Sequence, residues 1–177
     1  DPDVRAAQGS LFGVSERPVR LIDVAEGRAT LEAFMEQLSV DDLISLLCGQ
    51  PNTGVANTYG FGNLPEYGVP NIMTADGPAG LRIRPEVGVH TTAFPCATLL
   101  ASTWNEALVE QVGAAGAAEV LENNIAVWLT PAMNIHRSPL CGRNFEYYSE
   151  DPLVAGKTGA AMVRGIQSRN VAASVKH

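Results

Sequence analysis

The 177-residue chain lacks long apolar runs, clusters of basic residues and internal repeats. No uninterrupted apolar segment approaches the roughly 20 residues that a membrane-spanning helix requires. The formal net charge is −7, and no run of lysine or arginine occurs along the chain. A negatively charged chain of this kind is a poor partner for nucleic acid or for an anionic membrane surface. We therefore expect neither of them as a partner.

Cysteine is also scarce: Cys48, Cys96 and Cys141 are odd in number, far apart and without a C-x-x-C pair. This pattern favours free thiols in a reducing compartment and argues against a zinc site. His90 and His136 each stand alone, so histidine adds no metal-ligand spacing. We expect no bound metal and a cytoplasmic location. No secretory signal pattern is present, and because the chain starts with aspartate instead of methionine, we interpret it as part of a longer protein.

The composition is that of a folded domain, since 46% of the residues are hydrophobic and 18% are charged. A chain of this length can form one domain with a substantial core. Residues 1–28 are mixed polar, contain several glycines and have no sustained period, so we interpret them as a linker or an arm. The domain itself is expected to occupy residues 29–177.

The rest of the chain alternates between helical and strand patterns. Thr30 and Ser39 are expected to start two short helices, and Asp151 a longer one, because each is a favourable cap. Residues 50–69 are expected to form a loop that carries aromatic side chains. Strands are expected at 69–75, 96–103, 125–135 and 171–177, and longer helices at 103–123, capped by Thr103, and at 152–169.

This order of strands and helices indicates an α/β fold. A parallel crossover usually contains a helix, and none is evident between residues 77 and 95. The second expected strand, 96–103, can therefore run antiparallel to the first. A (β/α) barrel and an open doubly wound sheet are both compatible with the pattern, and both bind ligands at the carboxyl ends of their strands. The loop after the first strand is not G-x-G-x-x-G, so a dinucleotide site is poorly supported.

Four polar residues lie at or after the carboxyl ends of the expected strands and form a candidate ligand-binding set, here called the polar cluster: Asp76, Arg143, Lys176 and His177. Asp76 alone could merely stabilise a turn, but a carboxylate can also accept hydrogen bonds from two neighbouring hydroxyls, as a sugar offers. The guanidinium of Arg143 has five donors in a fixed fork that suits adjacent hydroxyl oxygens. Lys176 and His177 are adjacent, so the backbone must twist if both are to reach one ligand.

Glu146 is a tempting general acid or base in the loop 134–150. It lies between Arg137 and Arg143, and ion-paired networks gather charges without catalysing anything. We therefore interpret Glu146 and Arg137 as structural support that orients the loop.

Four segments together resemble the N-terminal barrel domain of glycoside hydrolase family 3, the β-glucosidase family. They are TADGPAGLR, TAFPCATLLASTWN, NIHRSPLCGRNFEYYSEDP and GIQSRNVAASVKH, in this order. A looser match, LIDVAEGRATLEAFMEQLSVDDLI, is similar to the junction in members whose sandwich domain precedes the barrel. The resemblance implies the first half of a (β/α)8 TIM-like barrel whose carboxyl-end face binds the non-reducing sugar of a β-glycoside.

The resemblance also implies a retaining hydrolase that releases terminal non-reducing β-D-glucosyl residues without a cofactor. The polar cluster matches the family's ligands for sugar hydroxyls. In such enzymes an aspartate attacks the anomeric carbon and a glutamate protonates the leaving oxygen. The family's aspartate lies in a Ser/Thr-Asp-Trp motif after the Lys-His pair, and this sequence contains neither SDW nor TDW. We therefore expect both catalytic carboxylates outside this chain, and no activity from the chain alone.

Three alternatives remain: a non-catalytic carbohydrate-binding module, a family member acting on β-xylosides or N-acetylglucosaminides, and a structural fragment without its own function. The expected partners are a β-glucoside or oligosaccharide and the remainder of the parent enzyme, namely the rest of the barrel and a sandwich domain. An open strand edge at VAASVKH would leave backbone groups unpaired. We therefore expect the chain to be stable only together with that remainder.

Overall fold

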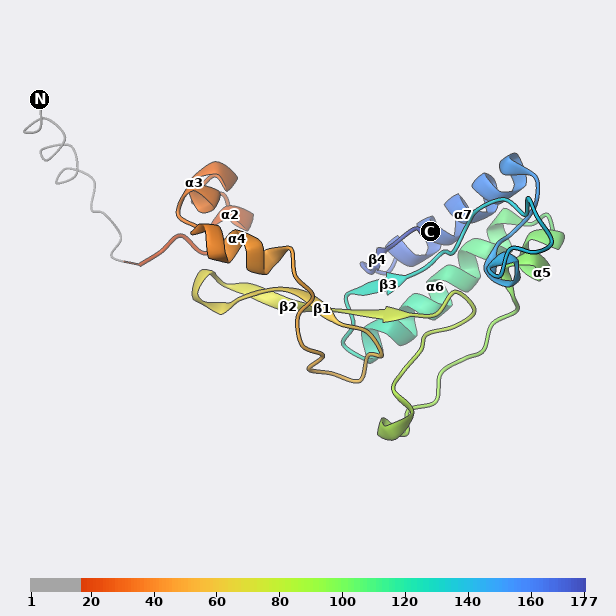
Figure 1. The fold of residues 1–177 in the computed structure, drawn as a ribbon, viewed down its shortest axis with the longest axis horizontal. Coiled ribbons are helices and arrows are strands. Elements are labelled where there is room, and N and C mark those ends of the chain that lie inside the picture. Colours follow the sequence, from red (N-terminus) through yellow and green to blue (C-terminus); the bar gives the residue numbers. More distant parts are fainter. Residues whose placement is uncertain (1–16) are drawn as a thin grey trace, which may run out of the picture. The chain divides into compact units, whose positions relative to one another are not determined.

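The computed structural model describes residues 17–177, and Figure 1 shows its helices and strands. The chain divides into two compact units, of which the first contains the residues up to 48 together with 62–70. The second unit contains residues 49–61 and 71–177. This division differs from the predicted boundary after residue 28, because the predicted arm holds a helix that packs with its neighbours. Residues 1–16 of that arm lie outside the described residues.

Three short helices form most of the first unit: α2 (Leu21–Ala25), α3 (Leu31–Glu36) and α4 (Val40–Leu46). The predicted caps are confirmed. The Thr30 hydroxyl accepts a hydrogen bond from the Ala33 amide at 3.1 Å, and Ser39 forms a capping box with Asp42. The buried apolar residues of this unit are Phe34, Leu38 and Leu64.

A buried carboxylate ties α2 to the chain on both of its sides. Asp23 is 4% exposed and accepts hydrogen bonds from the Arg17 side chain, the Arg20 backbone amide and the Arg28 side chain. These hydrogen bonds hold the pKa of the Asp23 carboxyl well below its usual range. The surrounding donors satisfy a charge that burial would otherwise penalise, which explains why residues 17–28 do not behave as a free linker.

The strands form one sheet in the order β1-β2-β3-β4. Its members are β1 (Gly60–Leu64), β2 (Val69–Asp76), β3 (Val127–Leu129) and β4 (Ala172–Ala173). Only the short helix η1 (Pro65–Tyr67) and Gly68 separate β1 from β2, so these strands form an antiparallel hairpin. The strands β2, β3 and β4 are parallel to one another. The predicted α/β class is therefore confirmed, and the antiparallel pair in the sheet is β1 with β2.

Two expected elements are wrong. The segment 96–103, expected as a strand, is the helix α5 (Ala97–Ser102). Its apolar residues are buried with the i, i+3, i+4 spacing of a helix, and a short apolar run is compatible with either element. The region 50–69, expected as a loop, contains β1, in which buried positions alternate with less buried ones. The last two expected strands are present but shortened to β3 and β4.

The helices α6 (Glu106–Glu122) and α7 (Pro152–Gln167) lie side by side in the second unit (Figure 1). Asp151 caps α7 as predicted, whereas Asn105 takes the place of Thr103 as the cap of α6. A Cβ atom on Gly116 of α6 would lie 2.6 Å from Cζ3 of the buried Trp128 in β3. Glycine therefore lets α6 pack directly on the sheet.

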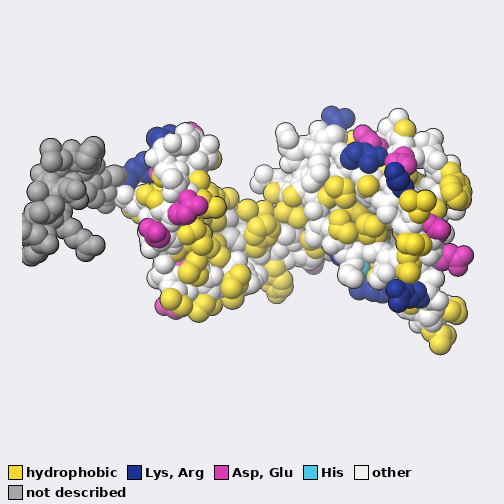
Figure 2. Space-filling view, turned by 90° about the horizontal axis from the view of Figure 1, so that it is seen from above, with side chains coloured by type: hydrophobic (Ala, Val, Ile, Leu, Met, Phe, Trp, Pro, Cys, Tyr) yellow, Lys and Arg dark blue, Asp and Glu magenta, His cyan; other side chains and the backbone are white. Residues whose placement is uncertain are grey.

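Apolar side chains remain at the surface of the second unit (Figure 2), including Trp104, which is 81% exposed. Two short helices, η2 (Pro85–Val87) and η3 (Asn144–Glu146), interrupt its long loops. None of the helices between residues 17 and 177 combines the length and the apolar character needed to cross a bilayer.

Candidate functional site

The carboxyl ends of the parallel strands bring the polar cluster together. Asp76 ends β2 and is in register with Leu129 at the end of β3. Lys176 follows β4, and its backbone amide donates to the Pro131 carbonyl, after β3, at 3.1 Å. Because parallel strands share one carboxyl edge, these segments meet there. The contacts described next confirm the predicted convergence of the cluster.

Asp76 and Lys176 form an ion pair between Oδ1 and Nζ. Their side chains are 25% and 19% exposed, so the pair is shielded from solvent without being sealed. Burial opposes ionisation of Asp76, but the hydrogen bond and the charge of Lys176 outweigh it, and the pKa of the carboxyl lies below its usual range. The ionised carboxylate retains acceptor positions beyond the one that Lys176 uses.

Arg143 lies in the loop after β3 and contacts both Glu146 of the same loop and His177, the residue after Lys176. Its Nε donates to Glu146 Oε1 at 2.5 Å, and its Nη2 lies 2.5 Å from His177 Nε2. A guanidinium can only donate, so His177 Nε2 accepts, which assigns the ring proton to Nδ1. Burial and the charge of Arg143 both lower the pKa of His177, in agreement with a neutral ring.

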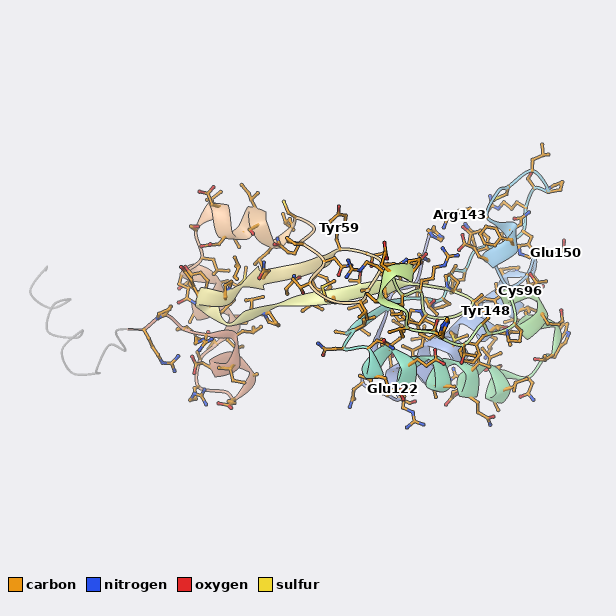
Figure 3. The ribbon with its side chains drawn as sticks, turned by 90° about the horizontal axis from the view of Figure 1, so that it is seen from below. Tyr59, Cys96, Glu122, Arg143, Tyr148 and Glu150 are labelled. Carbon is orange, nitrogen blue, oxygen red and sulfur yellow. The ribbon has the colours of Figure 1, made fainter. Side chains whose placement is uncertain are left out.

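Asp76 and Arg143, the partners of Lys176 and His177 in these contacts, border a cavity of about 380 Å³. Asp76, Arg143 and Glu146 line it together with the exposed Phe145. Figure 3 shows Arg143 at the end of the second unit that lies away from Glu122, the last residue of α6. A cavity of this size, with fixed donors and acceptors on its walls, suits a small ligand with several hydroxyl groups.

Arg82 also belongs to this site, although the order of the strands does not indicate it. Its side chain lines the cavity, and its Nη1 lies 3.7 Å from Asp76 Oδ2. The sequence contains one indication of this role, because Arg82 is a cationic residue in the glycine-rich turn that follows Asp76.

Glu146 and Arg137 were both expected to support the loop, and the structure treats these two predictions differently. The predicted pairing of Glu146 with Arg143 is confirmed, and Glu146 is 7% exposed. Arg137 is exposed, and within residues 17–177 it forms no ion pair with Glu146. In the same part of the chain, no three His, Cys, Asp or Glu side chains are grouped so that they could hold a metal ion.

Parallel strands, helices packed along them and a cavity with charged residues at their carboxyl edge are the arrangement of part of a TIM-like α/β barrel. Residues 61–177 match the family model described as the glycosyl hydrolase family 3 N terminal domain. The chain belongs to this family, as the four sequence segments predicted.

Several relatives and solved structures are similar to most of the chain. Beta-glucosidase A from Butyrivibrio fibrisolvens is 68% identical over 160 residues, which are 90% of this chain and 19% of the relative. A beta-glucosidase structure from Paenibacillus barengoltzii has a TM-score of 0.84 and 42% identity over 93% of this chain and 18% of that one. Beta-glucosidase 3B from Thermotoga neapolitana, in complex with alpha-D-glucose, has a TM-score of 0.74 and 43% identity, covering 81% and 22%. The chain thus spans about a fifth of the length of these proteins.

Proposed function

We propose that residues 1–177 form the sugar-binding part of a longer retaining β-glucosidase, which hydrolyses terminal non-reducing β-D-glucosyl residues. The observation that carries this proposal is the arrangement of the Asp76–Lys176 and Arg143–His177 contacts at one polar cavity. The relatives named beta-glucosidase, and the related structure that contains glucose, support glucose over other sugars.

Each member of the polar cluster would hold the sugar through its hydroxyl groups. Asp76 accepts hydrogen bonds from neighbouring hydroxyls, while Lys176 fixes the orientation of its carboxylate. Arg143 has donors that neither Glu146 nor His177 occupies. These contacts lie on the part of the sugar that does not react, and their binding energy positions the anomeric carbon for attack.

The two catalytic carboxylates would come from outside residues 1–177. Within the cavity, Asp76 is paired with Lys176 and Glu146 with Arg143, so both carboxylates are already engaged by cations. A retaining hydrolase needs a nucleophile and an acid/base about 5–5.5 Å apart, on either side of the glycosidic bond. The chain would therefore bind and orient the sugar, and the remainder of the enzyme would break the bond.

A chimera tests this proposal. The chain would replace the matching segment of Beta-glucosidase A from Butyrivibrio fibrisolvens, since the two are 68% identical over 160 residues. We expect the chimera to hydrolyse an aryl β-glucoside in preference to an aryl β-xyloside or an aryl N-acetyl-β-glucosaminide, and the 177-residue chain alone to hydrolyse none of them. A folded chimera without glucosidase activity would contradict the proposal. Hydrolysis by the chain alone, abolished by Asp76→Ala, would place the catalytic carboxylates inside the chain, with Glu146 and Asp151 the first to examine.

Glu146→Gln in this chimera should affect stability more than chemistry. The substitution keeps the size of a side chain that is 7% exposed but removes the charge that orients Arg143. Because Arg143 is itself half-exposed, we expect the free energy of unfolding to fall by only about 1–2 kcal/mol. Urea unfolding measures this change, and kcat measured beside it should stay within about tenfold of the unsubstituted chimera. A complete loss of kcat with unchanged stability would instead make Glu146 a catalytic residue.

A further inference from the structure

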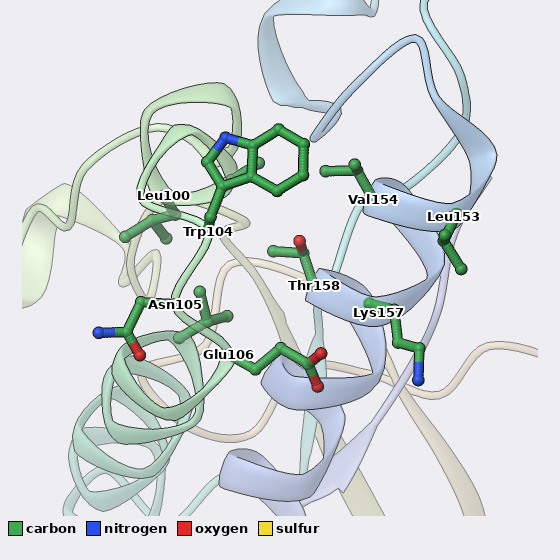
Figure 4. A pocket seen from close by; sticks show the side chains of 10 residues that line it. Leu100, Trp104, Asn105, Glu106, Leu153, Val154, Lys157 and Thr158 are labelled. Atoms are coloured by element: carbon green, nitrogen blue, oxygen red, sulfur yellow. The ribbon is translucent and has the colours of Figure 1, made fainter.

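A second hollow lies among the helices of the second unit, where α5 turns into α6 and where α7 begins. Its volume is about 170 Å³, and it shares no lining residue with the Asp76 cavity. Figure 4 shows the indole ring of Trp104 over this hollow, with Val154 and Thr158 on the other side. An adjoining hollow of about 410 Å³ is lined by Trp104, Ala101 and Val154 as well. The indole therefore stands where the two hollows meet.

Trp104 is exposed in a way that a core residue is not. It is 81% exposed, more than the rings of Tyr59 and Phe145. Its φ of 53° lies in the left-handed region that residues with a side chain rarely adopt. Its amide donates to the Ala101 carbonyl at 3.1 Å, which fixes the backbone at the end of α5. The chain thus holds an apolar ring outward at a defined position.

Two buried residues that line the hollows carry hydroxyl groups without a hydrogen-bond partner among residues 17–177. Thr158 is 7% exposed, and Figure 4 shows its hydroxyl pointing toward the indole; it makes no hydrogen bond to any of residues 17–177. Tyr148 is 3% exposed and lines the adjoining hollow, and its hydroxyl likewise has no partner in that part of the chain. Neither hydroxyl oxygen is among the fully buried atoms without a partner, so both are open to a ligand that enters the hollows.

The charges at the rim are balanced. Glu106 pairs with Arg164 at 3.3 Å, and Lys157 forms no ion pair with the described residues. One carboxylate and one ammonium on the hollow's rim do not favour a strongly charged ligand. The face of an aromatic ring is electron-rich, so it accepts the C–H groups of a pyranose, while the hydroxyls at the edge of the sugar reach donors and acceptors nearby. A neutral carbohydrate fits this combination.

We propose that Trp104 is the platform of a second carbohydrate-binding site, separate from the Asp76 site, for a β-linked gluco-oligosaccharide that crosses both hollows. One sugar ring lies on the indole beside Thr158, and the next extends toward Tyr148. The choice of a glucose-containing chain rests on the proposed function, whereas the platform and the hydroxyls do not. Such a site would hold a long substrate near the enzyme and raise its effective concentration at the Asp76 site.

The second site can be tested by calorimetric titration with a β-linked glucose tetramer. The protein titrated is the longest form that contains residues 1–177. An Asp76→Ala background removes the proposed sugar site, so the remaining binding reports on the Trp104 site. We expect Trp104→Ala to weaken this binding by about tenfold or more. Thr158→Val keeps the shape of the side chain and should weaken it less. Tyr59→Ala removes another exposed ring, 72% exposed, and should leave binding unchanged.

Equal tetramer binding by the Trp104→Ala and Tyr59→Ala proteins would overturn the second site. A changed association state of the Trp104→Ala protein, with unchanged tetramer binding, would also overturn it, because the indole would then serve a protein contact. Circular dichroism checks folding, and Thr158→Val keeps the test decisive if Trp104→Ala does not fold. The two proposals fail separately: full hydrolysis by the Asp76→Ala enzyme contradicts the proposed function and leaves Trp104-dependent binding untouched.

Discussion

Asp76→Ala should reduce kcat/KM for an aryl β-glucoside by about 100-fold or more in the active chimera. A hydrogen bond to a charged group typically contributes about 1.5–3 kcal/mol, and the sugar would lose more than one such bond. The substitution also leaves Lys176, whose side chain is 19% exposed, without its counter-charge. Arg143→Ala should cause a loss of similar size, because it removes sugar donors and the contact with His177 together.

Two controls separate this effect from a general loss of folding. Asp76→Asn keeps the shape of the side chain and some acceptor capacity, so its loss should be smaller than that of Asp76→Ala. Glu122→Ala removes an exposed carboxylate at the C-terminal end of α6, away from Arg143 (Figure 3), and should leave kcat/KM unchanged. Turnover numbers and Michaelis constants near those of the unsubstituted enzyme, for both Asp76→Ala and Arg143→Ala, would exclude the proposed sugar contacts.

Gly165→Ala should lower the free energy of unfolding by about 1–3 kcal/mol, although alanine is the better helix former. Gly165 lies in α7 where this helix meets α6. A Cβ atom at this position would lie 2.9 Å from the Glu110 carbonyl carbon and 3.0 Å from the Ala114 amide nitrogen. These backbone atoms cannot turn aside as a flexible side chain could, so the two helices would have to separate. Urea unfolding followed by circular dichroism measures the change.

Gly156 provides a matched control in the same helix. A Cβ atom there would meet no atom within 4 Å. Gly156→Ala should therefore stabilise the protein by up to about 1 kcal/mol, through the higher helix propensity of alanine alone. If both substitutions stabilise the protein equally, the packing of α6 against α7 is looser than the structure indicates.

The parts of this structure that depend on neighbouring residues could be predicted from the sequence. The caps at Thr30, Ser39 and Asp151 each involve residues only three positions away or nearer. Asp76 and Lys176 could be placed at one edge because each closes an apolar segment, and parallel strands share their carboxyl edge.

The parts that depend on packing could not be predicted. The apolar run of α5 fits a strand as well as a helix, and only its burial in the folded chain decides between them. The residues of β1, GFGNL, include few strand formers, and they become a strand by pairing with β2. Arg82 and Trp104 do not end a strand, so their positions follow from a turn and a helix end that the sequence alone does not place.

Asp76 and Lys176 meet although they are 100 positions apart in the sequence. Their contact requires β2, β3 and β4 to be aligned already, and contacts at such sequence separation carry the entropy of closing a long loop. An unfolded chain would therefore not present the two residues to a sugar together. A ligand that binds only the folded form stabilises it in proportion to the logarithm of its concentration. The sugar of the proposed function would thus also act as a reversible cross-link between β2 and β4, and the supply of substrate would help to decide how much of the chain stays folded.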